Sequence, residues 1–209
     1  QLSLNRRVAL KLILPERVGA RGKELFEREA RAGARLTHPG LIAVYESGET
    51  NGLLWIAMEL VEDGFDLRRS IEGLGRYEDL PQDYAAGVAR LVAKMADALV
   101  YAHGAGVVHR DLKPSNILLE YMPDKAYFVK LIDFGILKHL DKDNPRIEDG
   151  VSHTITQPTT LLGTPQYMAP EQIKGEKIDG RCDQYALAIL AYELVFGTRP
   201  FDGRTPMEV

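Results

Sequence analysis

Two short polar motifs lie close together in the sequence and carry side chains suited to phosphate chemistry. The first reads His-Arg-Asp-Leu-Lys-Pro-Ser-Asn and ends at Asn116, and the second is Asp-Phe-Gly, which begins at Asp133. We expect Asp111, Asn116 and Asp133 to lie on loops flanking one short hairpin, with Lys113 beside them. Oxygen-bearing side chains suit hard cations, and a carboxylate can accept the proton of a hydroxyl nucleophile. For either motif alone, an ordinary polar turn before a hairpin is the alternative.

The first part of the chain contains the elements that would position one cation near these loops. Residues 8–14 predict a strand that carries Lys11 and stops at a proline. Residues 21–36 predict a helix, because apolar residues recur on one face. Residues 41–45 and 53–61 predict two strands, and the Asn-Gly pair between them is typical of a hairpin. A small unit of three strands and one helix is therefore expected.

The second part is predicted to be mainly helical around a second small hairpin. A long helix is expected to begin at Pro81 and to be ended by Gly104 and Gly106. Its predicted apolar stripe consists of Val88, Leu91, Val92, Met95, Leu99 and Ala102. Residues 117–119 and 127–132 predict the two strands of the hairpin. The two polar motifs would then come directly before and after this hairpin.

Two further segments of the second part have a distinct character. Residues 138–162 lack apolar periodicity and are rich in charge, Thr and Pro, which is typical of a functional or disordered long loop. Residues 185–196 form the longest nearly apolar run, which is too short to span a bilayer and contains Glu193. We expect a fully buried helix there, and we interpret Cys182 as a small core residue.

Composition sets limits on the class of protein. The chain has 209 residues, 45% of them apolar, and a formal net charge of -4. This mild acidity predicts no nucleic-acid partner and no contact with an anionic membrane. One cysteine excludes an internal disulfide and favours a reducing compartment, so a cytoplasmic location is expected. No basic and then apolar leader opens the sequence, and no membrane segment is expected within it.

The two motifs together, at this separation, resemble the protein kinase family, and the resemblance extends over nearly the whole chain. It implies an α+β class and a bilobal kinase-like fold. Residues 1–61 would form a small β-rich lobe and residues 62–209 a mainly helical lobe. No glycine precedes Lys11, so the first strands and the glycine-rich loop of the family are expected to be missing. The sequence stops at Val209, so the last helices of the large lobe are expected to be missing too.

The resemblance implies a role for each polar residue of the motifs. Asp111 would accept the proton of the substrate hydroxyl, and Lys113 would neutralise charge on the transferred phosphoryl group. Asn116 and Asp133 would hold the Mg²⁺ ions that bridge the phosphates of ATP. Lys11, in Val-Ala-Leu-Lys, would pair with the α- and β-phosphates.

A glutamate on the first helix would orient Lys11, and Glu29 fits that position. It lies on the apolar side of its predicted helix, where a carboxylate needs a partner to offset desolvation. The alternative for Glu29 alone is a residue at the edge of a solvated face.

The resemblance also implies an adenine site. Met58 would border the adenine pocket, and Ala9 and Leu118 would lie on the two sides of the ring. The Glu59 carbonyl and the Val61 amide would bond adenine through the backbone, so that their side chains are poorly constrained. Plain core packing is the alternative for each apolar residue.

The segment from Gly-Thr to Ala-Pro-Glu matches the family's substrate-binding region. Thr164 in this segment, with Lys113, resembles kinases that act on Ser or Thr of proteins. In the family, an arginine such as Arg110 usually forms an ion pair with a phosphate on the activation loop, which implies autophosphorylation there. The candidate acceptors, each with a solvated loop threonine as the alternative, are Thr154, Thr156, Thr159 and Thr160.

The resemblance also implies structural roles for two acidic residues. Asp183 resembles the aspartate that anchors the backbone of the catalytic loop, and a helix-capping role is the alternative. Glu171 would pair with an arginine from the helices that the chain is expected to lack. Gly33 takes a place where many kinases have a larger apolar residue, which is expected to loosen the first helix.

The sequence leaves three candidate functions. The first is phosphorylation of Ser or Thr on proteins with ATP and Mg²⁺, in which a chain limited to residues 1–209 is expected to be impaired. The second is a non-catalytic binding or scaffold module. The third is a small-molecule phosphotransferase, against which Lys113 and the Ala-Pro-Glu segment argue. Among the kinases, the sequence resembles most the bacterial eukaryotic-like Ser/Thr kinases. Many proteins of that group carry a membrane span and a sensor beyond the kinase domain.

Overall fold

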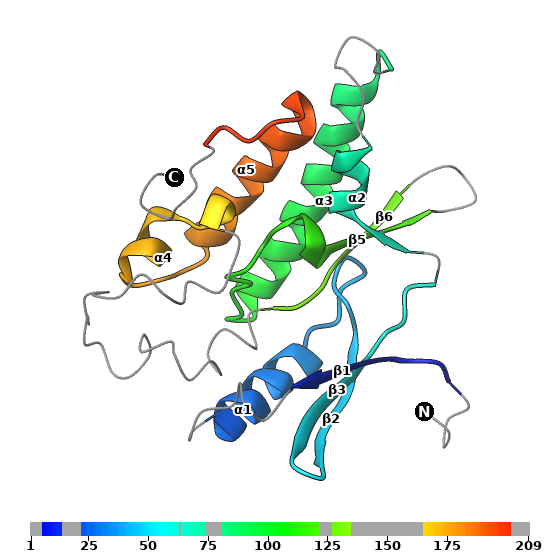
Figure 1. The fold of residues 1–209 in the computed structure, drawn as a ribbon, viewed down its shortest axis with the longest axis vertical. Coiled ribbons are helices and arrows are strands. Elements are labelled where there is room, and N and C mark those ends of the chain that lie inside the picture. Colours follow the sequence, from blue (N-terminus) through cyan, green and yellow to red (C-terminus); the bar gives the residue numbers. More distant parts are fainter. Residues whose placement is uncertain are drawn as a thin grey trace.

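The computed structural model describes residues 6–13, 22–62, 64–73, 81–121, 127–134 and 165–201, without the side chains of residues 22, 25, 29 and 121. Figure 1 shows a part with a sheet and one helix, and a larger, mainly helical part. The elements, in chain order, are β1 (Ala9–Ile13), α1 (Gly22–Ala34), β2 (Val44–Thr50), β3 (Leu53–Met58), β4 (Phe65–Asp66), α2 (Leu67–Glu72), α3 (Tyr84–Gly104), the 3-10 helix η4 (Pro114–Asn116), β5 (Ile117–Tyr121), β6 (Tyr127–Leu131), the 3-10 helix η5 (Pro165–Tyr167), α4 (Pro170–Lys174) and α5 (Arg181–Phe196).

The first sheet is antiparallel, with the strand order β1-β3-β2. Asn51 and Gly52 join β2 to β3 with φ values of 53° and 77°. Two successive left-handed residues are what a tight hairpin with right-handed strand twist requires. The predicted hairpin is therefore confirmed, and it places β3 in the centre of the sheet.

The strand predicted at residues 41–45 is wrong. The strand β2 begins only at Val44 and runs through a polar, largely exposed stretch to Thr50. Leu41 instead forms a parallel bridge with Leu131, and the amide of Ile42 donates to the Leu131 carbonyl at 3.0 Å. Backbone pairing with β3 decides where β2 lies, because this stretch has no apolar alternation for sequence to detect.

The second sheet has the order β4-β5-β6 and includes the predicted hairpin. The helix α3 packs along α5 (Figure 1). Its predicted stripe faces the core, and Gly106 takes a φ of 77° just after its end. The buried residues of the predicted stripe are Val88, Met95, Leu99 and Ala102.

The helix α5 confirms one expectation and contradicts another. Cys182 is buried, and burial raises the pKa of its thiol to about 12. Tyr192 and Phe196 keep 40% and 57% of their surface exposed, so the helix is not buried on all sides among the described residues. In the described ranges, no helix is both long and apolar enough to cross a lipid bilayer.

Two apolar clusters form the core. The smaller cluster lies between α1 and the first sheet and contains Phe26 and Ile56. The larger cluster lies among α3, α5 and the second sheet, and Leu36 and Leu41 of the first part belong to it. The division between residues 61 and 62 stays a prediction, with these two leucines packed on the far side of it.

Candidate active site

The loop between α3 and η4 carries Asp111 and is held from behind by α5. Arg110 has a φ of 63°, a left-handed conformation that strains a non-glycine residue. Asp183, which is 1% exposed, accepts hydrogen bonds from the amides of His109 at 2.8 Å and Arg110 at 2.7 Å. Asp183 therefore anchors the loop, as predicted. The N-cap position of α5 is Gly180, and Asp183 lies in the first turn of the helix.

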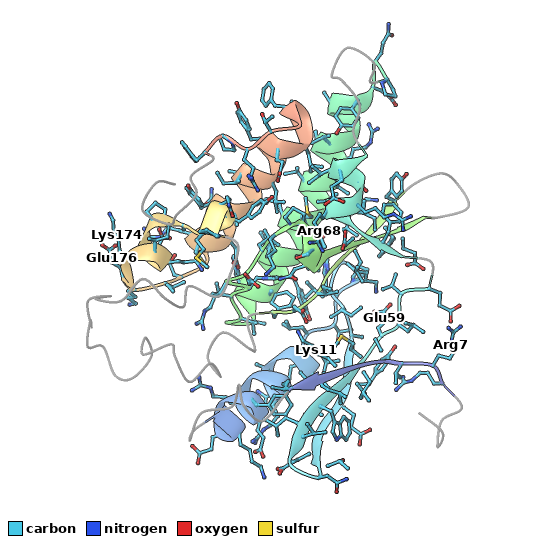
Figure 2. All side chains as sticks on the ribbon, viewed as in Figure 1. Arg7, Lys11, Glu59, Arg68, Lys174 and Glu176 are labelled. Atoms are coloured by element: carbon cyan, nitrogen blue, oxygen red, sulfur yellow. The ribbon has the colours of Figure 1, made fainter. Side chains whose placement is uncertain are left out.

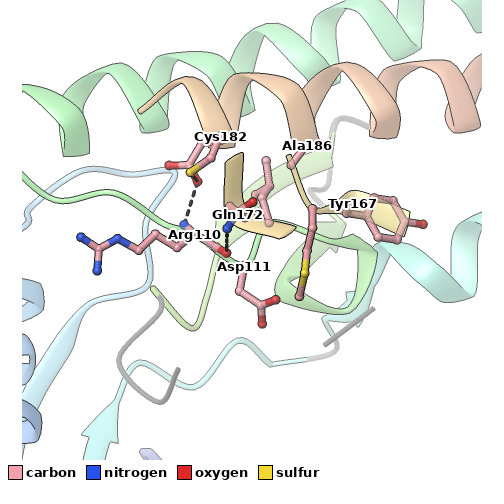
Figure 3. Close-up of a pocket in the computed structure, with 9 residues that line it drawn as sticks. Arg110, Asp111, Tyr167, Gln172, Cys182 and Ala186 are labelled. Atoms are coloured by element: carbon pink, nitrogen blue, oxygen red, sulfur yellow. Dashed lines mark hydrogen bonds between the residues drawn. The ribbon is translucent and has the colours of Figure 1, made fainter. Parts of the chain in front are cut away.

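The Asp111 carboxylate lies within a small set of polar groups. The Lys113 ammonium lies 3.0 Å from its Oδ2, and the Asn116 side-chain amide lies 3.2 Å from the same oxygen. The same amide also donates to the Asp111 carbonyl at 2.8 Å. In Figure 3 the Asp111 side chain points away from α5. The structure thus brings together three of the predicted site residues.

Asp133 lies two residues after the end of β6, the other strand of the hairpin, and meets a cation from the first sheet. The Lys11 ammonium lies 2.5 Å from the Asp133 carboxylate, and both side chains are about one third exposed or less (27% and 33%). The amide of Ile132 donates to the Asn116 carbonyl at 3.0 Å, which joins the two motifs beside Asp133. One carboxylate and one amide oxygen at this junction fit a Mg²⁺ ion that is completed by phosphate and water.

His109 joins the two motifs from inside the core. Its Nε2 donates to the carbonyl of Ile132 at 2.9 Å, and its Nδ1 accepts from the Asp111 amide at 3.3 Å. A carbonyl can only accept and an amide N–H can only donate, so this is the neutral imidazole with its proton on Nε2. Burial lowers the pKa of His109, in agreement with the neutral form. Its ring lies 4.6 Å from that of Phe134.

Four of the predicted adenine residues lie at or just after the end of β3 or pair with it, and the fifth, Leu118, lies on β5. Ala9 pairs with Met58 across the strands β1 and β3, and both are half-buried. Leu118 on β5 and Val61 are also half-buried. The Glu59 amide donates to the Ala43 carbonyl at 2.8 Å.

The expectation that the Glu59 side chain is poorly constrained is wrong. Lys130 on β6, which is 9% exposed, places its ammonium 2.7 Å from Oε1 and 2.8 Å from Oε2 of Glu59. The Ala43 amide donates to the same carboxylate at 3.2 Å. Figure 2 shows Glu59 on the connection that leaves the first sheet. Sequence spacing could not reveal this pair, because its partners are 71 residues apart.

Some predicted residues lie outside the described part of the structure. Glu29 lies on α1, but its side chain is outside it. Thr164 and the four activation-loop threonines are outside it as well. Glu171 is described and half-buried near the start of α4.

Comparison with known proteins identifies the family. A sequence model described as the protein kinase domain matches residues 1–209. The serine/threonine-protein kinase pkn3 of Myxococcus xanthus is 41% identical in an alignment of 208 residues that covers 97% of this chain and 35% of the relative. PknF of Mycobacterium tuberculosis is 39% identical in an alignment of 209 residues that covers 99% of this chain and 40% of the relative. The chain thus spans well under half the length of these curated relatives.

Solved structures agree with this match. The crystal structure of the Mycobacterium tuberculosis PknI kinase domain has a TM-score of 0.67 and 34% identity. The similarity covers 93% of this chain and 66% of that one. The predicted α+β kinase-like class is therefore confirmed, and the chain belongs to the protein kinase family.

Proposed function

We propose that the protein phosphorylates Ser or Thr hydroxyls of protein substrates, using ATP and Mg²⁺. One observation carries the proposal: the Lys11 ammonium meets the Asp133 carboxylate at 2.5 Å. Asp111, Lys113 and Asn116 lie together on the adjoining loop. The relatives named as serine/threonine-protein kinases support the substrate class.

The residues would divide the work of phosphoryl transfer. ATP with Mg²⁺, when bound, would supply the phosphoryl group and offset its charge. Asp133 and Asn116 would hold the metal, and Lys11 would turn from Asp133 toward the phosphates. Asp111, held by the bonds described above, would accept the hydroxyl proton, with Lys113 beside it as a fixed positive charge.

Nucleotide binding belongs to the same proposal. Ala9, Met58, Glu59, Val61 and Leu118 would border the adenine, between a lobe of residues 1–61 and a lobe of residues 62–209. In this proposal Glu29 orients Lys11, and a loop threonine is autophosphorylated. The expectation that a chain limited to residues 1–209 transfers phosphate poorly stays a prediction, tested by comparing it with a longer chain.

A phosphotransfer assay on the full-length chain with a protein substrate tests the roles. Asp133→Asn should abolish turnover and weaken Mg²⁺-dependent nucleotide binding, while Asp111→Asn should abolish turnover and leave nucleotide affinity within about twofold. Asp97→Asn, at a carboxylate that is 77% exposed, is the matched control and should change neither. Near-normal turnover of Asp133→Asn would contradict the metal role.

A non-catalytic scaffold is the second candidate, and ligand-dependent stability separates the two. At an ATP concentration 100 times Kd, binding should stabilise the folded chain by about 2.7 kcal/mol. This shift should require Mg²⁺ and be lost in Lys11→Met. Unchanged thermal unfolding with saturating ATP and Mg²⁺ would favour the scaffold.

A further inference from the structure

Gln172 is a buried polar residue that the roles above do not use. It lies on α4 and is 8% exposed. Its Oε1 accepts from the Ala169 amide at 3.0 Å. Its Nε2 donates to the Arg110 carbonyl at 2.9 Å, as Figure 3 shows. Because one partner is a donor and the other an acceptor, a primary amide is the side chain that satisfies both.

The hydrogen bond from Gln172 to the Arg110 carbonyl holds one edge of the peptide plane between Arg110 and Asp111. The Arg110 carbonyl and the Asp111 amide belong to the same planar unit. Gln172 holds the oxygen of this unit at 2.9 Å, and His109 Nδ1 holds its N–H at 3.3 Å. The plane directly before Asp111 is thus held at both edges. Its orientation sets the direction in which the Asp111 side chain leaves the backbone.

The same plane follows a strained residue, so it needs support. Arg110 has a φ of 63°, which persists only where the surroundings over-determine it. Asp183 holds the amide on one side of Arg110 at 2.7 Å, and Gln172 holds the carbonyl on the other. Side chains from α5 and α4 therefore hold this residue from both sides.

The second bond of Gln172 reaches the segment before α4. Ala169 is fully buried, and Tyr167 of the same segment donates to the Glu193 carboxylate on α5. A small pocket lies between this segment and the loop, lined by Tyr167, Met168 and Asp111 among others. Gln172 thus connects the Asp111 loop with the segment that faces it across this pocket.

We propose that Gln172 is a positioning residue, whose amide sets the orientation of the Asp111 carboxylate through the Arg110–Asp111 peptide. This inference rests on the proposed role of Asp111 as proton acceptor. It assigns to Gln172 a contribution to turnover, with no contribution to nucleotide affinity.

The substitution Gln172→Glu tests the bond, because it keeps the shape and changes only the donor. An ionised carboxylate can still accept from Ala169 but opposes the Arg110 carbonyl, whereas a protonated carboxyl can donate to it. At about pH 8 we expect kcat to fall roughly tenfold or more, with KM for ATP within about twofold. As the pH is lowered toward about 6, the ratio of variant to wild-type kcat should rise, because burial favours the protonated form.

Two further variants make the test specific. Gln172→Met is neutral and similar in length but lacks the amide, so its kcat loss should not depend on pH. Gln184→Glu, at an exposed position of α5, is the matched charge control and should behave as wild type. A Gln172→Glu variant with wild-type kcat at every pH overturns the inference, and so do equal, pH-independent losses in both Gln172 variants.

Amide hydrogen exchange gives a readout that does not need catalysis. Residues 107–112 should exchange faster in both Gln172 variants, and in Gln172→Glu the increase should shrink at lower pH. Unchanged exchange overturns the inference even if turnover is altered. A wild-type chain without phosphotransfer would contradict the proposed function, and exchange would then decide the role of Gln172 by itself.

Discussion

Replacing Lys130 with methionine should reveal how strongly the connection after β3 is tied to the second sheet. Lys130 is 9% exposed, and its ammonium lies 2.7 Å and 2.8 Å from the two oxygens of Glu59. Methionine keeps most of the aliphatic stem and removes the charge. Glu59 would then keep only the Ala43 amide, at 3.2 Å, among the described contacts of its carboxylate.

The burial of the pair sets the expected magnitude. Removing one partner of a fully buried pair costs about 3–5 kcal/mol, and an exposed pair contributes about 0–1 kcal/mol. The Glu59 side chain is 26% exposed and the Lys130 side chain is 11% exposed. The pair is therefore closer to a fully buried ion pair than to an exposed one. We therefore expect Lys130→Met to lower the free energy of unfolding by about 2–3 kcal/mol.

Denaturant unfolding in a double-mutant cycle measures this effect. Lys130→Met combined with Glu59→Met should cost less than the two single changes added together, by about 2 kcal/mol. Arg7 and Glu62 form the control pair, 2.9 Å apart with side chains 76% and 60% exposed. Arg7→Met should cost under about 1 kcal/mol and be salt-sensitive. Equal costs for both pairs, or simple additivity in the cycle, would refute the reasoning.

Three other substitutions give separate checks. Asp183→Asn should lower the free energy of unfolding by about 2–4 kcal/mol, because one oxygen that accepts a buried backbone N–H is lost. A denaturant midpoint near that of the wild type would contradict this prediction. Gly33→Ala should raise the free energy of unfolding by up to about 1 kcal/mol, since the added Cβ would lie 3.7 Å from Val44 Cγ2, an ordinary contact; a lower midpoint would show that the site is tighter. Burial lowers the pKa of His109 from 6.5 in the folded chain, so the unfolded chain binds more protons and stability should fall as the pH drops below about 6.5. His109→Gln should show a shallower fall between about pH 7.5 and 5.5, and equal slopes would speak against this titration.

Local signals predicted a large share of the fold. The Asn-Gly turn, the stripe of α3 and the glycines after it are decided by residues close in sequence, and the structure has them where expected. The position of β2 cannot be predicted from the sequence, because its polar and largely exposed residues carry no periodic signal. Backbone pairing with β3 determines its position.

The site divides in the same way. Lys11, Asp111, Asn116 and Asp133 stand in recognisable motifs. The structure pairs Lys11 with Asp133 and Asn116 with Asp111, on loops that a backbone hydrogen bond joins. Lys130 and Gln172 carry no such signal, because their partners lie 71 and 62 residues away. Their contacts form only because the packed core brings distant segments of the chain together.

The burial of Leu36 and Leu41 in the larger cluster bears on how the chain can be dissected. These leucines are 5% and 2% exposed and pack among residues of α3, α5 and the second sheet. A polypeptide started at Glu62 would leave a void where they belong and would also lose the hydrogen bonds that residues 40 and 42 make with Leu131. A helical half would therefore need residues 36–42, but β2 and β3 of the first sheet follow these residues in the chain, so neither a cut at Glu62 nor a cut at the end of α1 leaves both parts whole.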